Sequence, residues 1–386
     1  MEPVRDDADI VIVGGGVIGI SIAFHLTQMG HSKVIVVERG EIGEGATSQA
    51  TGGIRQQFTS KINARLVRRS LDFFSAFQDR TGEPFNFRQH GYLFLLTTER
   101  QWEVFSRAVQ MQNALDIPSR TMTPAEVRAG FAGIDVDDLV GATYCPTDGS
   151  GSPYDAVTGM ARAATRAGAR IVRHTKVTGF LRSRQGRVTG VKTPTGELNA
   201  AAVIIAAGPQ SREVGRLAGV ELPVAPHRRQ AFAVKGTDWM GDRYPLTVDV
   251  TTGAYIHPER EGNAVIGGND RSVPEGTSTA VDRSLLEPLL EALVHRWPSM
   301  AEAQVSRAWA GLREMTPDDH AIVGAVPHTP GLWAAVGFSG HGFMQAPAVG
   351  EAMAQLLLHG ESDIDLEPLR PTRFSENEPV VEDVLF

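Results

Sequence analysis

Apolar runs and helical repeats alternate at the start of the chain. DIVIV at residues 9–13 is an apolar run typical of a buried parallel strand, residues 17–29 carry helical periodicity, and KVIVVE at 33–38 is a second apolar run. This order predicts a βαβ unit. AAVIIAAG at 201–208 has the same fully apolar character and predicts another strand of this kind.

Helical patterns and one separate strand fill the region between these runs. GYLFLL at 91–96 predicts a strand outside the first unit, and the run ARIVRHTKV at 169–177 predicts a further one. Helices are predicted over residues 66–78, around 99–115, over 124–130 and in the segment before residue 169.

The pattern changes between about residue 222 and residue 320. AFAV (231–234), AYIHP (254–258) and NAVIGGND (263–270) are short, spaced by turn residues and partly alternating, which favours an antiparallel sheet. The chain then returns through two apolar runs, at 320–327 and 331–338, to the glycine-rich segment GFSGHGFMQAPAVGE, which opens an apolar-periodic helix. A second glycine turn and helix start therefore lie more than 300 residues after the first.

Composition and charge exclude several classes of protein. The chain has 386 residues, 42% of them apolar, a formal net charge of −8 and a single cysteine, Cys145, so neither a disulfide within the chain nor a cysteine-based metal site can form. We expect no metal. The acidic start and the absence of a long apolar run predict a cytoplasmic protein without a membrane span. The scattered basic residues argue against nucleic acid as a partner.

The first glycine turn carries the fingerprint of a dinucleotide site. Gly14, Gly16 and Gly19 fit G-x-G-x-x-G between a strand and a helix, and Glu38 ends the next strand. The glycines allow a tight turn, approach of a pyrophosphate and close helix packing, while Glu38 can accept hydrogen bonds from ribose hydroxyls. Free N–H groups at the helix start, around Val17 and Ile18, would hold the phosphates. The motif does not distinguish NAD from FAD, and a purely structural glycine turn is the alternative.

These patterns together predict an α/β fold with two interleaved domains. A Rossmann-like nucleotide-binding domain is expected over residues 1–88, 145–215 and 321–386, and an antiparallel-sheet substrate domain over 89–144 and 216–320.

Several further motifs resemble one family along nearly the whole chain. With the N-terminal fingerprint, the segments GATSQATGGIRQQF, GYLFLL, PTDG, WAGLREMTPDDHAIVG and AAVGFSGHGFMQAPAVGE are similar to the D-amino acid oxidase superfamily of flavoenzymes. The likeness is to the branch of sarcosine oxidase, glycine oxidase and dye-linked proline dehydrogenase. It implies that the dinucleotide is FAD and that the first domain is an FAD-binding domain.

The second glycine turn then has an expected ligand. A flavin that takes up a hydride gains negative charge, and the backbone N–H groups of Gly342, Phe343 and Met344, with the positive end of the helix dipole, would stabilise it. The resemblance implies that this turn lies beside the flavin ring, with Gly340 and His341 next to it. A tight helix–strand junction without a ligand is the alternative for the glycines, and a hydrogen bond to a backbone carbonyl is the alternative for His341.

The resemblance also implies further contacts to FAD. Thr47 and Ser48 lie in the segment that resembles the family's ribityl-binding loop, Arg39 is expected near the adenine ribose, and Val177 and Gly208 end the two matching strands.

Arginine is the natural partner of a substrate carboxylate, because its planar guanidinium forms two parallel hydrogen bonds. Arg313 matches the carboxylate-binding arginine of glycine oxidase and D-amino acid oxidase, Arg55 matches one in sarcosine oxidase, and Tyr255 resembles the active-site tyrosine of these families. An ion pair for either arginine and a packed core position for the tyrosine are the alternatives. We therefore expect small secondary amino acids as substrates, oxidised at the C–N bond to an imine.

Three positions depart from monomeric sarcosine oxidase. Gly311 stands where the family member carries its flavin-linking cysteine, which predicts non-covalent FAD, and Met344 replaces a carboxylate-binding lysine. Val265 replaces a lysine that promotes the reaction with oxygen. Arg313 is retained from glycine oxidase, which uses oxygen without that lysine, so we expect oxygen as acceptor and hydrogen peroxide as product.

Three other interpretations of the chain stand beside this one. In the first, the chain is the catalytic subunit of a dye-linked L-proline dehydrogenase-type complex and passes electrons to partner subunits. A tRNA-modifying oxidase would require a basic face, which an acidic chain does not favour. An NAD-dependent dehydrogenase leaves the second glycine turn unexplained.

Overall fold

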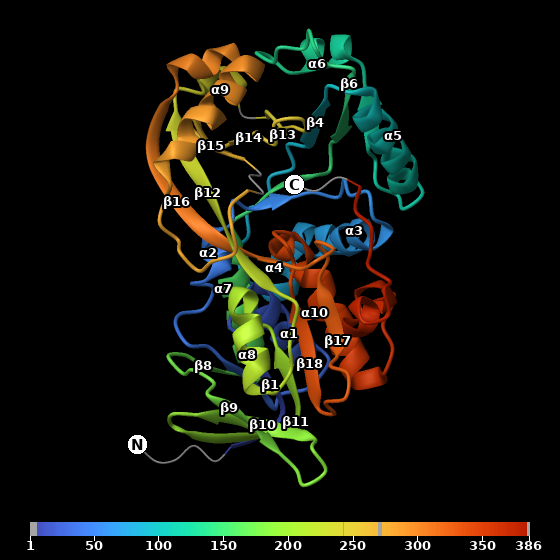
Figure 1. Cartoon of the computed structure of the whole chain (residues 1–386), viewed down its shortest axis with the longest axis vertical. Helices are drawn as coiled ribbons and strands as arrows, with labels where there is room; N and C mark the ends of the chain where they lie inside the picture. Colours follow the sequence, from blue (N-terminus) through green and yellow to red (C-terminus); the bar gives the residue numbers. More distant parts are fainter. Residues whose placement is uncertain (1–5, 242, 269–271, 384–386) are drawn as a thin grey trace.

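A computed structural model describes residues 6–241, 243–268 and 272–383 of the chain. The chain has a mixed α/β fold in two parts, each built around its own large sheet, stacked along the long axis of the molecule (Figure 1).

The first sheet has a parallel centre in the strand order β17-β18-β11-β1-β2-β8. Parallel pairs join β1 to β2 and β11, β2 to β8, and β11 to β18, with Val11 opposite Val203 and Ile12 opposite Val36. The hairpin β9–β10 is attached to β11 by antiparallel pairing, and β17 closes the other edge. The strands are β1 (Asp6–Val13), β2 (Val34–Val37), β8 (Arg170–Val172), β9 (Gly179–Arg182), β10 (Val188–Thr193), β11 (Gly196–Ile205), β17 (Ile322–Ala325) and β18 (Leu332–Val336).

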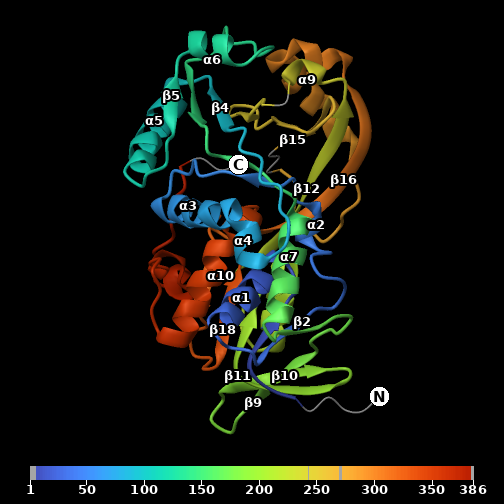
Figure 2. The same ribbon diagram turned by 180° about the vertical axis from the view of Figure 1, so that it is seen from behind.

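Both faces of this sheet are buried, as its continuous apolar strands predict. Ile10 and Ile12 pack toward one face, which is covered by long helices, while Val11 and Val13 pack toward the other face, under β9–β10 and the short helix α8 (Ser211–Leu217). The covering helices are α1 (Val17–Gln28), α3 (Lys61–Ser75), α4 (Phe77–Thr81), α7 (Pro153–Arg166) and α10 (Gly342–His359). Figure 2 shows α1, α7 and α10 on this side.

The second sheet has the order β16-β12-β15-β14-β13-β4-β6-β5, and all of its pairs are antiparallel except β13 with β4. Helices α5 (Glu99–Asn113), α6 (Pro124–Gly130) and α9 (Leu286–Arg296) pack around it. The strands are β4 (Tyr92–Leu96), β5 (Arg120–Met122), β6 (Gly141–Cys145), β12 (Ala225–Lys235), β13 (Leu246–Asp249), β14 (Tyr255–Pro258), β15 (Asn263–Gly267) and β16 (Gln304–Met315).

The long pair β12–β16 reaches from the second sheet down to the first, as Figure 1 shows. Its lower end packs on α2 (Ala46–Gln49) and on the single turn η1 (Gly208–Gln210). A separate two-stranded sheet, β3 (Gly53–Ile54) with β7 (Gly149–Ser150), lies near the same junction. The junction therefore places residues from both sheets around one space.

The predicted βαβ start and the antiparallel region agree with the structure, but some limits differ. The strand expected at 201–208 is present as β11, but it begins at Gly196 and ends at Ile205, and Gly208 starts η1 instead. The expected strand 169–177 ends at Val172, because the chain turns at His174, whose φ is +52°, and Thr175 bonds back to Glu38. The expected helix 66–78 is broken between α3 and α4. Asn269 and Asp270, at the end of the expected strand 263–270, lie outside the described residues. The limits of the two domains stay a prediction.

Candidate active site

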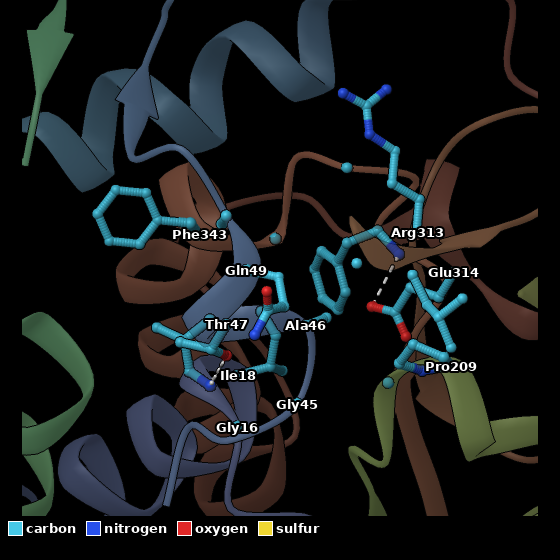
Figure 3. Close-up of a pocket in the computed structure, with 18 of the residues that line it drawn as sticks. Gly16, Ile18, Gly45, Ala46, Thr47, Gln49, Pro209, Arg313, Glu314 and Phe343 are labelled. Carbon is cyan, nitrogen blue, oxygen red and sulfur yellow. Dashed lines mark hydrogen bonds between the residues drawn. The ribbon is translucent and has the colours of Figure 1, made fainter. Parts of the chain in front are cut away.

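One cavity of about 1150 Å³ lies where the two sheets meet. It is lined by the first glycine turn and α2 at one end, and by the C-terminal glycine turn and strands of the second sheet at the other. Figure 3 shows Gly16, Thr47 and Ile18 on one side of this space, and Arg313 and Glu314 on the other.

The glycines of the first turn have distinct roles. Gly14 has φ +119°, and a Cβ there would lie 2.2 Å from the carbonyl oxygen of Ala206. A Cβ at Gly19 would lie 2.0 Å from the carbonyl oxygen of Gly14, so both glycines are required by close backbone packing. A Cβ at Gly16 would have the hydroxyl oxygen of Thr47 as its nearest neighbour, at 3.5 Å. Gly16 thus leaves its side of the turn open to the cavity, as approach of a phosphate requires.

Thr47 and Ser48 differ in what their hydroxyls do. The Thr47 oxygen accepts a hydrogen bond from the backbone N–H of Val17 at 3.1 Å, so this buried threonine braces the start of α1 at the cavity wall. Ser48 is not among the residues that line the cavity. Its hydroxyl donates instead to the carbonyl of Glu44 at 2.7 Å, a back-bond available to serine in a helical turn. Ser48 therefore lies outside the cavity wall, and its contact with FAD stays a prediction.

Glu38 is held at the cavity edge by backbone groups. Its carboxylate accepts from the N–H of Gly15 at 2.7 Å and from the N–H of Gly40 at 2.8 Å. Arg39 is exposed and lines the cavity beside it. Val177, between β8 and β9, and Gly208, at the start of η1, also line the cavity. Of the predicted cofactor residues, the structure brings all to the cavity wall except Ser48 and Gly19, and Gly19 serves helix packing as its motif position implies.

The second glycine turn leads directly into α10. Gly340 has φ +93°, and a Cβ there would lie 2.7 Å from Nε of Arg313, so the turn packs on the arginine side chain. In the described part of the chain, no side chain caps the N-terminus of α10. The first N–H groups of a helix have no carbonyl partner within it, and Gly342, Phe343 and Met344 all line the cavity. A helix N-terminus thereby opens onto the cavity.

Arg55 is a buried cation at the far end of the cavity. Its side chain donates to the carbonyl of Gln57 at 2.9 Å, approaches Nε2 of His341 at 3.4 Å and stacks over the ring of Phe58 at 4.2 Å. Arg55 is 5% exposed, and among the described residues no carboxylate pairs with it. A buried guanidinium without a carboxylate partner is expected to attract an anionic ligand.

Two tyrosines accompany the arginines. Burial raises the pKa of Tyr92 to about 12, while the nearby Arg55 and Arg313 oppose that rise. Burial also raises the pKa of Tyr255, against the effect of Arg313. Gly267 gives the Tyr255 ring its space, because a Cβ there would lie 2.4 Å from the phenol oxygen. Both hydroxyls therefore stay protonated at neutral pH and can donate to a ligand.

Sequence reasoning missed several residues of the site. Tyr92 belongs to the apolar strand pattern GYLFLL, and such a pattern does not reveal which of its side chains faces a cavity. Gln49 and Trp309 also line the space, and the indole N–H of Trp309 donates to the carbonyl of Gln49 at 3.2 Å. Glu314 lines it as well, and its place directly after Arg313 was the available signal.

The three positions that depart from sarcosine oxidase behave differently in the structure. A Cβ at Gly311 would lie 2.6 Å from Cβ of Gln49, so the position has no room for a side chain unless α2 shifts. Met344 is buried and lines the cavity. Val265 is buried in β15 but is not among the lining residues.

The cavity fits an extended dinucleotide such as FAD. It joins two helix N-termini, one behind the open side of Gly16 and one at Gly342, and an acid for ribose hydroxyls lies at its edge. Across the described ranges, no group of His, Cys, Asp or Glu is arranged to hold a metal ion, and no helix is long and apolar enough to cross a membrane. The fold and this site define a two-domain dinucleotide-binding oxidoreductase.

Comparison with known families makes this class specific. Residues 9–356 match the family model described as "DAO: FAD dependent oxidoreductase", so the chain belongs to this family and its cofactor is FAD.

The relatives act on different amines. The chain is 30% identical to glycine oxidase of Geobacillus kaustophilus, covering 95% of this chain and 97% of that protein. It is 27% identical to human mitochondrial sarcosine dehydrogenase over 97% of this chain, but spans only 42% of that longer protein. Among solved structures, L-proline dehydrogenase from P. horikoshii superposes with a TM-score of 0.91 at 30% identity, covering 98% of this chain and all of the other.

Proposed function

We propose that the protein oxidises the C–N bond of a small secondary amino acid such as sarcosine, with an imine as product. The observation that carries this proposal is the cluster of Arg55, Arg313, Tyr92 and Tyr255 in the same cavity as the N-terminus of α10. The sarcosine and proline enzymes among the relatives support a secondary amino acid, and glycine oxidase supports a small amino acid more generally.

The cluster has the chemistry to bind and orient an amino acid. Arg313 offers two parallel N–H donors to the carboxylate, and the protonated Tyr255 and Tyr92 can donate to the same group. The carboxylate would then be held at this end, with the α-carbon directed toward α10. Apolar side chains of Leu246 and Val248 line the adjacent wall and exclude water. When bound, FAD supplies the acceptor for the hydride that leaves the α-carbon.

The direct test is anaerobic mixing of FAD-loaded protein with sarcosine, L-proline and glycine in turn. The proposal predicts loss of the oxidised flavin absorbance with sarcosine or proline, followed by formaldehyde and glycine from sarcosine after hydrolysis of the imine. Glycine, a primary amine, is expected to reduce the flavin more slowly. Unchanged absorbance with every amino acid would reject the proposal.

We propose oxygen as the electron acceptor, with hydrogen peroxide as product. The alternative is an L-proline dehydrogenase-type subunit that passes electrons to a partner, and the likeness to that enzyme and the apolar Val265 favour it. Mixing the reduced protein with air distinguishes the two. An oxidase regains its oxidised absorbance within the turnover time and forms one peroxide per flavin, whereas a dehydrogenase reacts far faster with an artificial dye.

A further inference from the structure

Glu314 is a half-buried acid that substrate binding does not require. It follows Arg313 near the end of β16, and consecutive strand residues point to opposite faces. Figure 3 shows the Arg313 guanidinium directed away from the Glu314 carboxyl group, which faces the segment around Pro209. The two neighbours thus reach different parts of the same cavity wall.

The Glu314 carboxyl group is bonded on one side only. Oε1 accepts from the backbone N–H of Phe338 at 3.3 Å, and the backbone carbonyl of Glu314 accepts from the N–H of Ser339 at 3.0 Å. Glu314 is thus attached to the segment that leads into the C-terminal glycine turn. Oε2 is buried and has no hydrogen-bond partner among the described residues, and a Cβ at Gly208 would lie 3.7 Å from it.

Glu314 forms no ion pair with the described charged groups around it. Among the described residues, none of the basic side chains pairs with it. α2 and η1, which pack on β16, contain no charged residue. The other titratable groups on its own and the neighbouring segments are Arg307 and Arg313 on β16, His227, Arg228, Arg229 and Lys235 on β12, Arg212, Glu213 and Arg216 on α8, and His341 in the glycine turn.

We propose that Glu314 is a proton-carrying carboxyl group that couples reduction of bound FAD to the uptake of a proton from solvent. Glu314 would take up a proton that offsets the negative charge arriving on FAD, because it lies in the cofactor cavity between the end of β11 and the turn before α10. This inference requires FAD in the cavity but does not depend on which amine is the substrate.

The electrostatics of the site support this role. Burial raises the pKa of Glu314 to about 7, and the N–H groups of Phe338 and Gly337 oppose the rise. Negative charge that arrives in the cavity on reduction disfavours the carboxylate and raises this pKa further. At a pH between the pKa of Glu314 with oxidised FAD and its pKa with reduced FAD, Glu314 is ionised before reduction and protonated after it. Two electrons then enter with one proton on FAD and a second proton on Glu314.

The test compares the midpoint potential of wild-type protein and Glu314→Gln from pH 6 to pH 9, with electrons supplied by an electrode through mediator dyes. Above about pH 7, where Glu314 begins to ionise, the potential of the wild type should fall with the slope of two protons per electron pair, and that of Glu314→Gln with the slope of one. Glu302→Gln is the matched control, because Glu302 is exposed, lies outside the cavity and precedes the same strand. Equal slopes in wild type and Glu314→Gln would overturn the proposal.

A second measurement needs no variant and no substrate. Wild-type protein is reduced anaerobically in weak buffer with a pH indicator dye, and the protons taken up per FAD are counted. Uptake should rise from one toward two above about pH 7, where Glu314 begins to ionise. Uptake of one proton at every pH in that range would contradict the proposal even if Glu314→Gln fails to fold. Because no amino acid is added, failure here is separate from failure of the proposed amine oxidation.

Discussion

At the scale of single residues, Arg313 is the group on which the substrate proposal most depends. Its side chain packs on Gly340 of the C-terminal turn and lies within electrostatic reach of Tyr92 and Tyr255. Arg313→Ala removes a charge-assisted pair with the carboxylate, which costs roughly 2 to 5 kcal/mol when the pair is desolvated. We expect kcat/KM for sarcosine to fall by orders of magnitude while the flavin spectrum stays unchanged.

The control for this variant is Arg128→Ala, which removes an arginine from an exposed surface pair with Asp137. Its kcat/KM should equal that of the wild type. If Arg313→Ala also keeps full efficiency, Arg55 is the carboxylate-binding residue and the assignment to Arg313 is wrong.

A second prediction at this scale concerns the attachment of FAD. Gly311 offers no nucleophile, and Cys145 does not line the cavity. Burial raises the pKa of the Cys145 thiol to about 12, so it stays protonated and unreactive. Precipitation with acid should therefore release all of the yellow colour into the supernatant. Colour retained in the pellet would show a covalent bond at a residue not identified here.

Prediction of single residues from the sequence succeeded where a residue type and a motif together determine the chemistry. Gly14 and Gly340 needed no knowledge of the fold, because a positive φ and close neighbours disfavour a side chain at such turns. Tyr92 and Glu314 could not be assigned in this way. Tyr92 matters because its side chain faces the cavity and is desolvated there, and Glu314 matters because one of its oxygens is buried away from hydrogen-bond partners in the described chain. Both features depend on long-range packing.

At the scale of elements, the carboxyl-terminal segment is attached to the start of α3 through Glu382. Its carboxylate accepts from the N–H groups of Thr59 and Ser60 at 2.6 and 3.2 Å, and from Nδ2 of Asn63 at 3.1 Å. His320 lies 3.5 Å from it. The hydroxyls of Thr59 and Ser60 also donate to Glu382. These contacts anchor the loop that follows Phe58, the residue on which Arg55 stacks.

This anchor should make stability depend on pH. Hydrogen bonds and His320 lower the pKa of Glu382 to about 2 against the effect of burial. Its stabilising contribution is therefore present above the unfolded pKa, roughly 4.3, and is lost as the pH falls toward 2. Glu382→Gln should lower the free energy of unfolding at pH 7 by roughly 1 to 3 kcal/mol, and the difference from wild type should shrink below about pH 4.

Denaturant titrations at several pH values measure this effect. Glu378→Gln is the matched control, because Glu378 lies in the same segment but pairs at the surface with Arg370. A loss in Glu382→Gln that equals the loss in Glu378→Gln would mean that Glu382 provides no anchor.

The elements of the first sheet could be predicted because their strands are short, apolar and buried on both faces. The hairpin β9–β10 was missed, since its residues are mostly half-buried or exposed and carry no strong periodicity. The pairing order of the second sheet was also beyond prediction. β4 pairs with β13 and β6, which follow it by more than 40 residues, and only the packed fold determines these partners.

At the scale of the whole molecule, the fold brings the FAD-binding residues and the proposed substrate-binding residues to one cavity. The first sheet presents the glycine turn and Glu38, the second sheet presents Arg313 and Tyr255, and α10 begins between them. The net charge of −8 does not prevent an anionic substrate from binding, because the buried Arg55 and the cavity-lining Arg313 provide positive charge at the substrate end.

The most direct test of this account is a crystal structure of the protein with FAD and a thioether analogue of sarcosine, in which sulfur replaces the amine nitrogen so that oxidation is blocked. The account predicts the flavin ring beside the N-terminus of α10 at Gly342, and the analogue's carboxylate within hydrogen-bonding distance of the Arg313 guanidinium. A flavin ring away from this helix start, or a carboxylate bound outside the cluster of Arg55, Arg313, Tyr92 and Tyr255, would contradict it.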